Sequence, residues 1–395
     1  MINSSAGVLF TLVAIAAFWF FVEKRTAWRI FDFLPPLLFI YATPIILSNT
    51  DIIFGLDTKV LVNGSPVYTG MREFGLPIAI SLMLLSVNVP AAVRIMGGGV
   101  AVMLMGTAGV VVGGVVSYLL VHTHLQPDAW KAVGTLAGSW IGGTGNMAAA
   151  HVALEGGPEH LGLAVLADNM VYVVWLPILL GSRAFAEKFN AWARVPADRI
   201  VKMEQASISL HREERAVTMR DYLNLGVIGL GVTWASNLVA PLLPVIENVL
   251  STSTWVILLV TTFSLLLSIT NARHIPGSQN IAMAIIYVFV AGMGARAALD
   301  GLSQAPWFVL GAFIWIAIHG AFCLAGSWLF KVDVHSAAIA SAANIGGAAS
   351  APVVAAYHRP TLVPVAILMA LIGYAIGNYL AILTGIMAGR LVGAG

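Results

Sequence analysis

Residues 138–150 read Gly-Ser-Trp-Ile-Gly-Gly-Thr-Gly-Asn-Met-Ala-Ala-Ala, and a related stretch, Ser-Ala-Ala-Asn-Ile-Gly-Gly-Ala-Ala-Ser-Ala-Pro, occupies residues 341–352. Each lies in an apolar run about as long as a membrane span, but its centre holds glycine and small polar residues. Because glycine has a low helix propensity, we expect both helices to unwind near mid-membrane. The exposed backbone groups then need water, an ion or a substrate. Two such segments at matching places predict a transporter binding site.

The composition places the chain in the membrane. Of 395 residues, 59% are hydrophobic and only 10% are charged, whereas soluble domains carry roughly 25% charged residues. We therefore expect an all-α polytopic membrane protein. The net charge of +2 gives no reason to expect a nucleic-acid partner, and the single cysteine, Cys323, excludes an intrachain disulfide framework. The sequence has no Walker lysine motif and no zinc-ligand spacing, so we expect neither an enzyme nor a bound cofactor.

A charged segment divides the chain into two halves. Apolar runs fill residues 1–182 and 221–395, and residues 183–220 contain more charged residues than any other connection. We predict a first transmembrane repeat, a cytoplasmic connector and a second transmembrane repeat over these three ranges. With a shift of 204 residues, Ile141-Gly142-Gly143 falls on Ile345-Gly346-Gly347, which favours an internal duplication.

The basic residues predict opposite orientations for the two halves. Lys24 and Arg25 fit a first half that begins outside the cell, and Arg220, Lys331 and Arg390 fit a second half that begins inside. Six apolar runs in each half would leave both halves in the same orientation. Either one run in a half is a half-span or re-entrant, or a helix is missed or counted twice; we expect roughly ten to thirteen spans.

Asp168 is the most informative single residue. It lies several residues inside an apolar run from residue 161 to residue 182, where a carboxylate costs at least ~2.5–3.5 kcal/mol on insertion scales. We expect it to face a cavity and, with Asn169, to bind a coupling ion, either H⁺ or Na⁺. The alternative is a structural aspartate that holds helices together.

The two glycine-rich breaks add further candidates. Where a helix unwinds, its second part begins with free N–H groups that suit a carboxylate, and its first part ends with free carbonyl groups that suit Na⁺. The predicted coupling-ion residues are Asp168, Asn169, Asn146 and Thr144. The predicted substrate-binding residues are Ser139, Gly142, Gly143, Gly145, Asn344, Gly346, Gly347, Ser350 and Asn378. The alternative is that these small residues only let helices pack closely. His319 is a weaker candidate for proton transfer.

Four stretches carry a family resemblance: residues 139–146, Leu166-Ala-Asp-Asn169, Ala343-Asn-Ile-Gly-Gly347 and residues 372–378. The chain resembles the YjcL-like family of uncharacterised bacterial multi-spanning membrane proteins, which is grouped with the cation/proton antiporter and anion transporter superfamily. The resemblance implies two inverted repeats and a pair of broken, crossing transmembrane helices, as in sodium/proton antiporters or bile-acid symporters. It also implies a moving core domain, a panel or dimerisation domain, a homodimer and a place in the cytoplasmic membrane.

Two departures bear on function. Asp168-Asn169 stands where the antiporters carry Asp-Asp or Asn-Asp, and residues 362–389 contain no lysine to match that of electrogenic antiporters. Both favour a secondary active transporter of a small organic, carboxylate-bearing solute, coupled to H⁺ or Na⁺, with solute and membrane lipid as its partners. The alternatives are a monovalent cation/proton antiporter and, from another class, an intramembrane enzyme or sensor that transports nothing.

Overall fold

The computed structural model describes residues 2–26, 28–32, 36–54, 59–62, 64–87, 97–208, 215–246, 251–296 and 305–393. These residues are almost entirely helical. This part of the chain contains no β-strand, and Ile2 and Leu61 form an isolated bridge. The predicted all-α class is therefore confirmed.

Seven helices among the described residues are long and apolar enough to cross a membrane. Their helical segments are α1 (Ser5–Thr26), α7 (Gly98–Val121), α10 (Pro158–Gly181), α13 (Met219–Val239), α15 (Ser278–Arg296), α16 (Ala305–Phe330) and α19 (Val363–Leu391). Two shorter apolar helices are α2 (Pro36–Ser48) and α14 (Thr252–Ser268). Helix α4 (Pro66–Gly70) continues through a π-helical turn (Met71–Gly75) into α5 (Leu76–Leu85). Their number and composition are those expected of a multi-spanning membrane protein.

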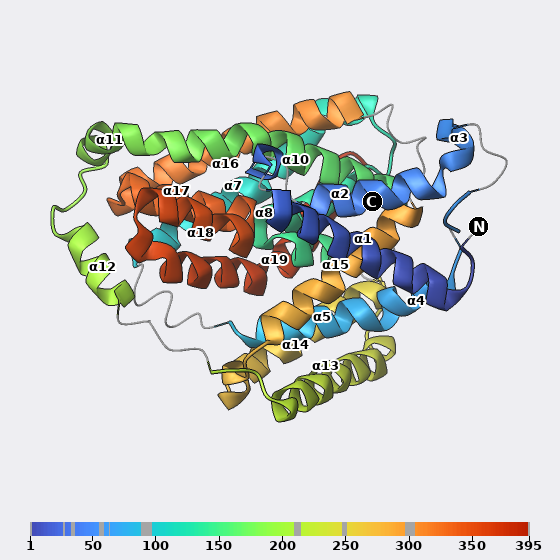
Figure 1. The fold of residues 1–395 in the computed structure, drawn as a ribbon. Helices are drawn as coiled ribbons and strands as arrows, with labels where there is room; N and C mark the ends of the chain where they lie inside the picture. The colour runs from blue at the N-terminus through green and yellow to red at the C-terminus, as the bar shows by residue number, and fades with distance from the viewer. Residues whose placement is uncertain are drawn as a thin grey trace.

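The helices form two bundles (Figure 1). The first bundle contains α1, α2, α4, α5, α13, α14 and α15. The second bundle contains α7, α10, α16 and α19 together with α8 (Trp130–Gly142), α9 (Thr144–Ala153), α17 (Val334–Ile345) and α18 (Gly347–His358). Each half of the chain supplies both bundles. In the first bundle, α5 of the first half packs on α13 and α14 of the second half. In the same way, α15 of the second half packs on α1 and α2 of the first half.

Glycine sets the close packing at the centre of the second bundle. A Cβ atom on Gly113 of α7 would lie 2.5 Å from Cδ1 of Trp315 on α16, so the indole occupies the space that a side chain would need. The Nε1–H of Trp315 donates to the backbone oxygen of Val110 at 2.7 Å. Small residues therefore let α7 and α16 approach closely, as helices in membranes often do.

The helix ends gather at two opposite faces of the molecule. The connector face carries α11 (Ala186–Trp192) and α12 (Arg199–Ile208), at the left of Figure 1. Arg199 forms an ion pair with Asp333 there, at 3.2 Å. At the other face, which we call the terminal face, α1 begins and α19 ends. The ring of His124, which follows α7, stacks on Trp307 of α16 at this face, with 3.9 Å between ring centroids.

The stretch containing residues 138–150 folds back on itself. Helices α8 and α9 pack as a hairpin, because a Cβ atom on Gly138 would lie 2.5 Å from the backbone oxygen of Asn146. At the open end, Lys131 Nζ donates to the backbone oxygen of Glu155 at 3.3 Å. The chain turns at Gly143, whose φ of 80° and ψ of −169° suit glycine. We call α8 and α9 the first hairpin; it opens towards the terminal face.

Helices α17 and α18 form a second hairpin, which opens towards the connector face. His335 near the start of α17 and His358 at the end of α18 lie with their Nδ1 atoms 3.0 Å apart, and the chain turns at Gly346 and Gly347. The sequence prediction of broken helices that cross the membrane is therefore corrected. The glycine turns reverse the chain, so the arms pack on each other instead of continuing in one direction.

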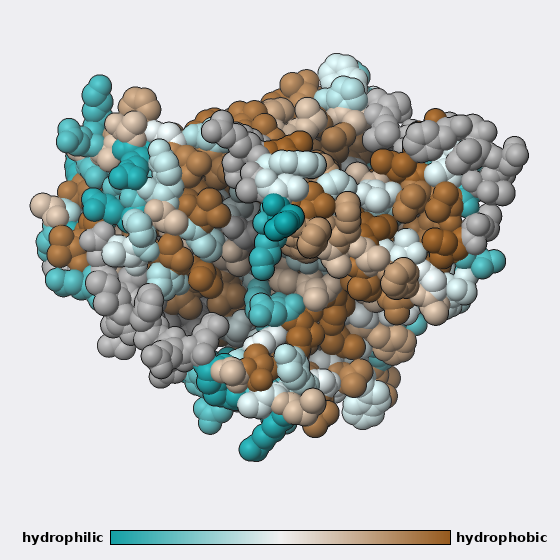
Figure 2. Space-filling model, in the orientation of Figure 1, coloured by the Kyte–Doolittle hydropathy of each residue, from teal (hydrophilic) through white to brown (hydrophobic). Residues whose placement is uncertain are grey.

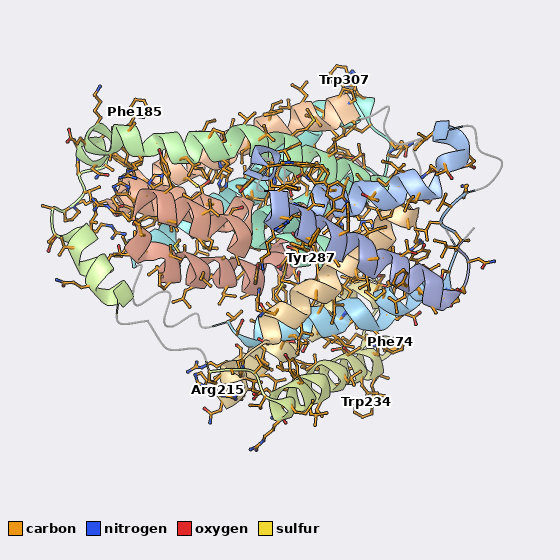
Figure 3. The ribbon with its side chains drawn as sticks, in the orientation of Figure 1. Phe74, Phe185, Arg215, Trp234, Tyr287 and Trp307 are labelled. Carbon is orange, nitrogen blue, oxygen red and sulfur yellow. The ribbon has the colours of Figure 1, made fainter. Side chains whose placement is uncertain are left out.

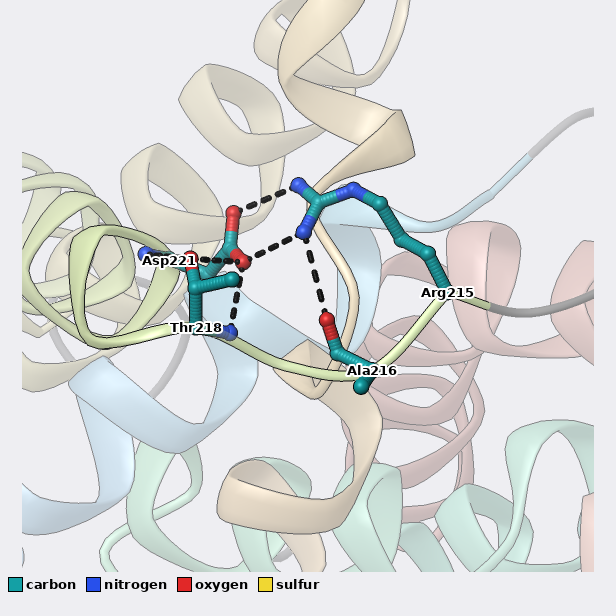
Figure 4. A network of polar contacts seen from close by, with 4 residues as sticks. All are labelled: Arg215, Ala216, Thr218 and Asp221. Carbon is teal, nitrogen blue, oxygen red and sulfur yellow. Dashed lines mark hydrogen bonds and ion pairs between the residues drawn. The ribbon is translucent and has the colours of Figure 1, made fainter.

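The surface separates apolar and polar regions. Hydrophobic side chains cover much of the face in Figure 2, and hydrophilic ones gather over α11 and α12 at the connector face. Near the start of α13, Arg215 donates two hydrogen bonds to Asp221, at 2.6 and 2.7 Å, and the backbone and hydroxyl of Thr218 also donate to that carboxylate (Figure 4). The carboxylate raises the pKa of Arg215. This network fixes where the connector ends and α13 begins.

Candidate functional site

The tips of the two hairpins meet inside the second bundle. A Cβ atom on Gly347 would lie 3.5 Å from the backbone oxygen of Gly142 and 3.5 Å from Cα of Gly143. The ring of Tyr374 on α19 lies against both tips, 3.5 Å from the Cβ position of Gly143 and 3.3 Å from that of Gly347. Two helix ends and two helix starts therefore come together at one place.

Asp168 of α10 lies beside the first tip and is partly exposed. Its Oδ2 accepts a hydrogen bond from Ser139 Oγ at 2.9 Å, and its Oδ1 accepts one from Trp140 Nε1 at 2.8 Å. Both donors are neutral and belong to α8. They orient the carboxylate and leave its charge without a counter-ion in any ion pair seen in the described part of the chain.

A cavity of roughly 730 Å³ adjoins these groups. From the second bundle it is lined by Ser139, Gly143, Thr144, Asp168, Asn169, Tyr172, Leu176, Pro177, Leu180, Ile345, Gly346, Ser350 and Val353. From the first bundle it is lined by Phe20, Glu23, Phe31, Pro36, Leu37 and Tyr287. It therefore lies between the bundles, where Figure 3 places Tyr287.

The cavity extends from the hairpin tips towards the connector face. Its lining includes Leu180 near the end of α10, Glu23 near the end of α1 and Pro36 at the start of α2. The end of α10 leads into α11 at that face. The cavity therefore extends along α10 from Asp168 towards that face.

Tyr172 links two walls of the cavity. It lies one helical turn after Asp168, and its hydroxyl is 2.8 Å from Ser350 Oγ on α18. Asn169 donates from Nδ2 to the backbone oxygen of Val165 at 2.7 Å. The amide nitrogen of Asn169 is therefore bonded within its own helix, and its side-chain oxygen can accept a hydrogen bond.

The structure brings some of the predicted site residues to the cavity. These are Ser139, Gly143, Thr144, Asp168, Asn169, Gly346 and Ser350. Among the others, Gly142 and Gly347 form the contact between the tips, and a Cβ atom on Gly145 would lie 2.5 Å from Met83 Sδ of α5. The glycines thus serve the turn and the packing around it.

The three remaining asparagines are fully buried and hold the hairpins to their neighbours. Asn146 donates from Nδ2 to the backbone oxygen of Tyr374 at 3.0 Å and to Asn378 Oδ1 at 2.8 Å, and Asn378 donates to Thr261 Oγ1 at 2.7 Å. Asn344 donates to the backbone oxygen of Met103 at 3.0 Å and accepts from a threonine of α7. None of the three lines the cavity, so they position the tips instead of contacting a solute there.

Sequence reasoning missed the residues that the first bundle contributes. Glu23, Phe20 and Tyr287 are far from both glycine-rich stretches in the sequence, and only the packing of the two bundles brings them to the cavity. Tyr172 had a local signal, since it follows Asp168 at the four-residue spacing that places side chains on one helix face.

One buried pair has the geometry of a nucleophile and a base. His319 Nδ1 lies 2.9 Å from the backbone oxygen of Gly106, so Nδ1 carries the proton, and Nε2 accepts from Ser341 Oγ at 2.9 Å. Trp175 Nε1 also donates to Ser341 Oγ, at 3.0 Å. Ser341 and His319 are buried and do not line the cavity beside Asp168, and the network joins α10, α16 and α17.

A carboxylate and histidine cluster at the terminal face has ligand atoms within 4.8 Å of one another: Asp128, Glu159 and His160. The backbone N–H of Gly157 donates to His160 Nδ1 at 2.8 Å, so Nδ1 is the unprotonated nitrogen. A neutral histidine that bound a metal through Nε2 would need its proton on Nδ1. This tautomer therefore does not suit a metal site.

Comparison with known proteins agrees with this description of a membrane protein. A relative from Bacillus subtilis (strain 168), the "Uncharacterized membrane protein YjcL", is 27% identical over 341 residues, which cover 83% of this chain and 85% of the relative. The family model described as "Protein of unknown function (DUF819)" matches residues 10–391. The chain therefore belongs to the DUF819 family of membrane proteins, as its resemblance to the YjcL-like proteins indicated.

Proposed function

We propose that this protein is a secondary active transporter that moves a small organic solute across the cytoplasmic membrane by alternating access. The proposal depends on one observation above all: two hairpin tips meet beside a carboxylate and a cavity that extends from them along α10. Irregular backbone at membrane depth is tolerated where it lines such a cavity. Transporters of several folds bind solute and ion at places of this kind.

The basic residues support a cytoplasmic connector face, because cytoplasmic loops carry an excess of lysine and arginine. By the order and direction of the helices, basic residues at this face include Lys24, Arg25, Arg183, Lys188, Arg194, Arg199, Arg215, Arg220, Arg273, Lys331 and Arg359. Described residues at the terminal face are Lys59, Arg72, Lys131, Arg296 and Arg390. Arg390, which the sequence suggested would be cytoplasmic, thus lies at the terminal face with the smaller group of basic residues.

The hairpins give a consistent topology. Among the described residues, each half then has five spans and a re-entrant hairpin: α1, α2, α4 with α5, α7 and α10 in the first half, and α13, α14, α15, α16 and α19 in the second. An odd number of spans places the second half in the opposite orientation to the first. This arrangement fits inverted repeats, whereas the re-entrant hairpins differ from the crossing broken helices that the superfamily resemblance implied. The predicted homodimer remains an expectation from that resemblance.

The two faces differ in access to the tips. Towards the terminal face, α9 packs against α5 and α14, and Thr254 Oγ1 of α14 donates to the backbone oxygen of Ala153 at 2.6 Å. Towards the connector face lies the cavity. These contacts fit a cytoplasm-open state. Movement of the second bundle against the first would close that route and open the other.

Asp168 is the residue that we assign to ion coupling. An ionised carboxylate is costly inside a membrane, so it favours states in which a proton, a sodium ion or a solute group balances its charge. Ser139 and Trp140 keep its oxygens oriented during this exchange. Thr144, Asn169 and Tyr172 lie on the same cavity and supply further oxygen atoms.

Purified protein in liposomes tests the proposal. Solutes that raise its thermal stability are added outside, and a pH-sensitive dye inside reports proton movement, with and without Na⁺. We expect a solute-dependent signal that Asp168→Asn abolishes and that Asp128→Asn, a matched change at the terminal face, leaves intact. Ion-dependent stabilisation and proton movement that persist unchanged in Asp168→Asn would remove Asp168 from the coupling role.

A monovalent cation/proton antiporter is the second candidate, because the cavity contains the carboxylates of Asp168 and Glu23. In that case the addition of Na⁺ or K⁺ alone, without any organic solute, would move protons in the same liposomes. The absence of such a signal, together with a solute-dependent one, would exclude this alternative.

A further inference from the structure

The charges that line the cavity are negative. Its charged lining residues in the described part of the chain are Glu23 and Asp168, one from each bundle. From this and from its aromatic walls we propose that the transported solute is a small organic cation, such as a protonated amine. This inference rests on the proposed function and replaces the carboxylate that the sequence alone suggested.

Electrostatics disfavour an anionic solute at this place. A carboxylate there would meet two acidic side chains in a low-dielectric environment with no described lysine, arginine or histidine on the cavity lining. The hairpin tips do not supply the missing positive charge. Each tip joins the negative end of one helix to the positive end of the next, so the two helix dipoles largely oppose each other.

Aromatic rings complete a site for a cation. Phe20 and Tyr287 pack edge to face with 4.8 Å between ring centroids, and both line the cavity. Phe31 and Tyr172 line it too. The faces of aromatic rings attract ammonium groups, and this attraction is larger where water is excluded. The apolar part of an organic cation also gains from leaving water.

The cavity size favours an organic cation over a bare metal ion. A volume of roughly 730 Å³ lies in the range of small-molecule sites. A dehydrated alkali ion needs a close shell of oxygen atoms, whereas most of this lining is apolar or aromatic. The cavity can therefore hold an ammonium group near a carboxylate and the rest of the molecule against the rings.

The position of the two carboxylates gives them different roles. Glu23 lies near the connector end of the cavity, on α1, and Asp168 lies next to the hairpin tips. Glu23 attracts the cation at the cytoplasmic mouth, and Asp168 binds it at the tips after releasing a proton. One carboxylate that accepts either a proton or the ammonium group couples the two in opposite directions.

Matched probes test the sign of the charge. The thermal stability of the purified full-length protein is measured at pH 7 with n-butylammonium, n-butanol or butyrate, and with tetramethylammonium. We expect both cations to raise the melting temperature in a saturable manner, and we expect butanol and butyrate to have little effect. Stabilisation by butyrate equal to or larger than that by butylammonium would overturn the proposal.

Matched variants test the residues. Glu23→Gln should weaken cation binding at least tenfold, which corresponds to about 1.4 kcal/mol, and Glu23→Asp should restore part of it. Glu187→Gln, which removes an exposed carboxylate of α11, is the control. Phe20→Leu should weaken binding less, and Phe10→Leu on the exposed part of the same helix should leave it unchanged. Unchanged affinity in Glu23→Gln contradicts the proposal.

Transport separates this inference from the proposed function. Liposomes loaded with butylammonium are diluted into labelled butylammonium, and exchange is followed. Binding in detergent without exchange would contradict transport and leave the cation site standing. Solute-driven proton movement with a neutral or anionic solute, and no binding of either cation, would overturn the cation site alone.

Discussion

Both hairpins turn at paired glycines, but their second helices, α9 and α18, have different surroundings. We call these two helices the outer arms. In the first hairpin, α9 is enclosed by α5, α14 and α19, and Ala149 on it is fully buried. In the second hairpin, α18 borders the cavity, and Val353 and Tyr357 are 52% and 51% exposed. With the shift of 204 residues that aligns the tips, Val353 corresponds to Ala149.

The first helices of the hairpins, α8 and α17, which we call the inner arms, differ as well. Gly138 of α8 allows backbone contact with Asn146 and Met147, whereas the aligned position of α17 is Ala342, which carries a methyl group. The first hairpin is therefore the more closely packed. An alternating-access transporter needs one hairpin to close its side of the membrane while the other faces an open cavity. The difference in packing between the two hairpins fits this requirement.

Accessibility should separate the hairpins most strongly. In a Cys323→Ala background, Val353→Cys should react readily with a water-soluble maleimide at the connector face, and Ala149→Cys should react hardly at all, because the first side chain is exposed and the second is fully buried. Mass spectrometry of the labelled protein measures both rates. A cation that occupies the cavity should slow the reaction at position 353.

The same experiment checks the sidedness. In inverted membrane vesicles, whose cytoplasmic side faces the medium, Val353→Cys should react faster than in right-side-out vesicles. The wild-type protein is the control, since Cys323 is buried. Equal labelling of the two engineered cysteines would mean that the outer arms do not differ in solution.

Packing of the inner arms gives the next largest effect. Gly138→Ala places a Cβ atom 2.5 Å from the backbone oxygen of Asn146, and a backbone atom inside a hairpin cannot move aside easily. We expect a loss of about 1–3 kcal/mol in the free energy of unfolding. Ala342→Gly in the second hairpin should cost only about 1 kcal/mol, the usual penalty of glycine in a helix. Thermal unfolding in detergent compares them, and the reverse order would show that the second hairpin is the tighter.

The sequence predicted the parts of this architecture that depend on local composition. The apolar runs predicted membrane helices, and the interruption at Gly142 and Gly143 correctly marked where a helix ends. The distribution of Lys24, Arg25 and Lys331 also conflicted with six spans in each half. Periodicity alone could not decide whether the chain continues or reverses after a glycine, because that depends on the φ of Gly143 and on the packing of the arms.

The candidate site was only partly visible in the sequence for a related reason. Asp168 stood out because a carboxylate is rare inside an apolar run. Asn146, Asn344 and Asn378 have the same polar character as cavity residues but hydrogen-bond to neighbouring helices. Composition cannot separate a polar side chain that faces a solute from one that fixes a helix. Glu23 lies at a helix end, where charged residues are common, so nothing in the sequence indicated that it lines the cavity.

The turns themselves should give the smallest difference between the hairpins. Gly143 has φ 80° and ψ −169°, a region almost confined to glycine, and Gly347 has φ 56°. The nearest atom to each Cβ position is Cε1 of Tyr374, at 3.5 Å for Gly143 and 3.3 Å for Gly347, so alanine is disfavoured by backbone strain more than by a clash. We expect Gly143→Ala to cost about 1–3 kcal/mol and Gly347→Ala about 1 kcal/mol, whereas the control Gly226→Ala, in an open position of α13, should gain about 1 kcal/mol. Thermal unfolding of the three variants measures the order, and a Gly143→Ala protein as stable as the control would mean that the first hairpin turns with a different backbone geometry.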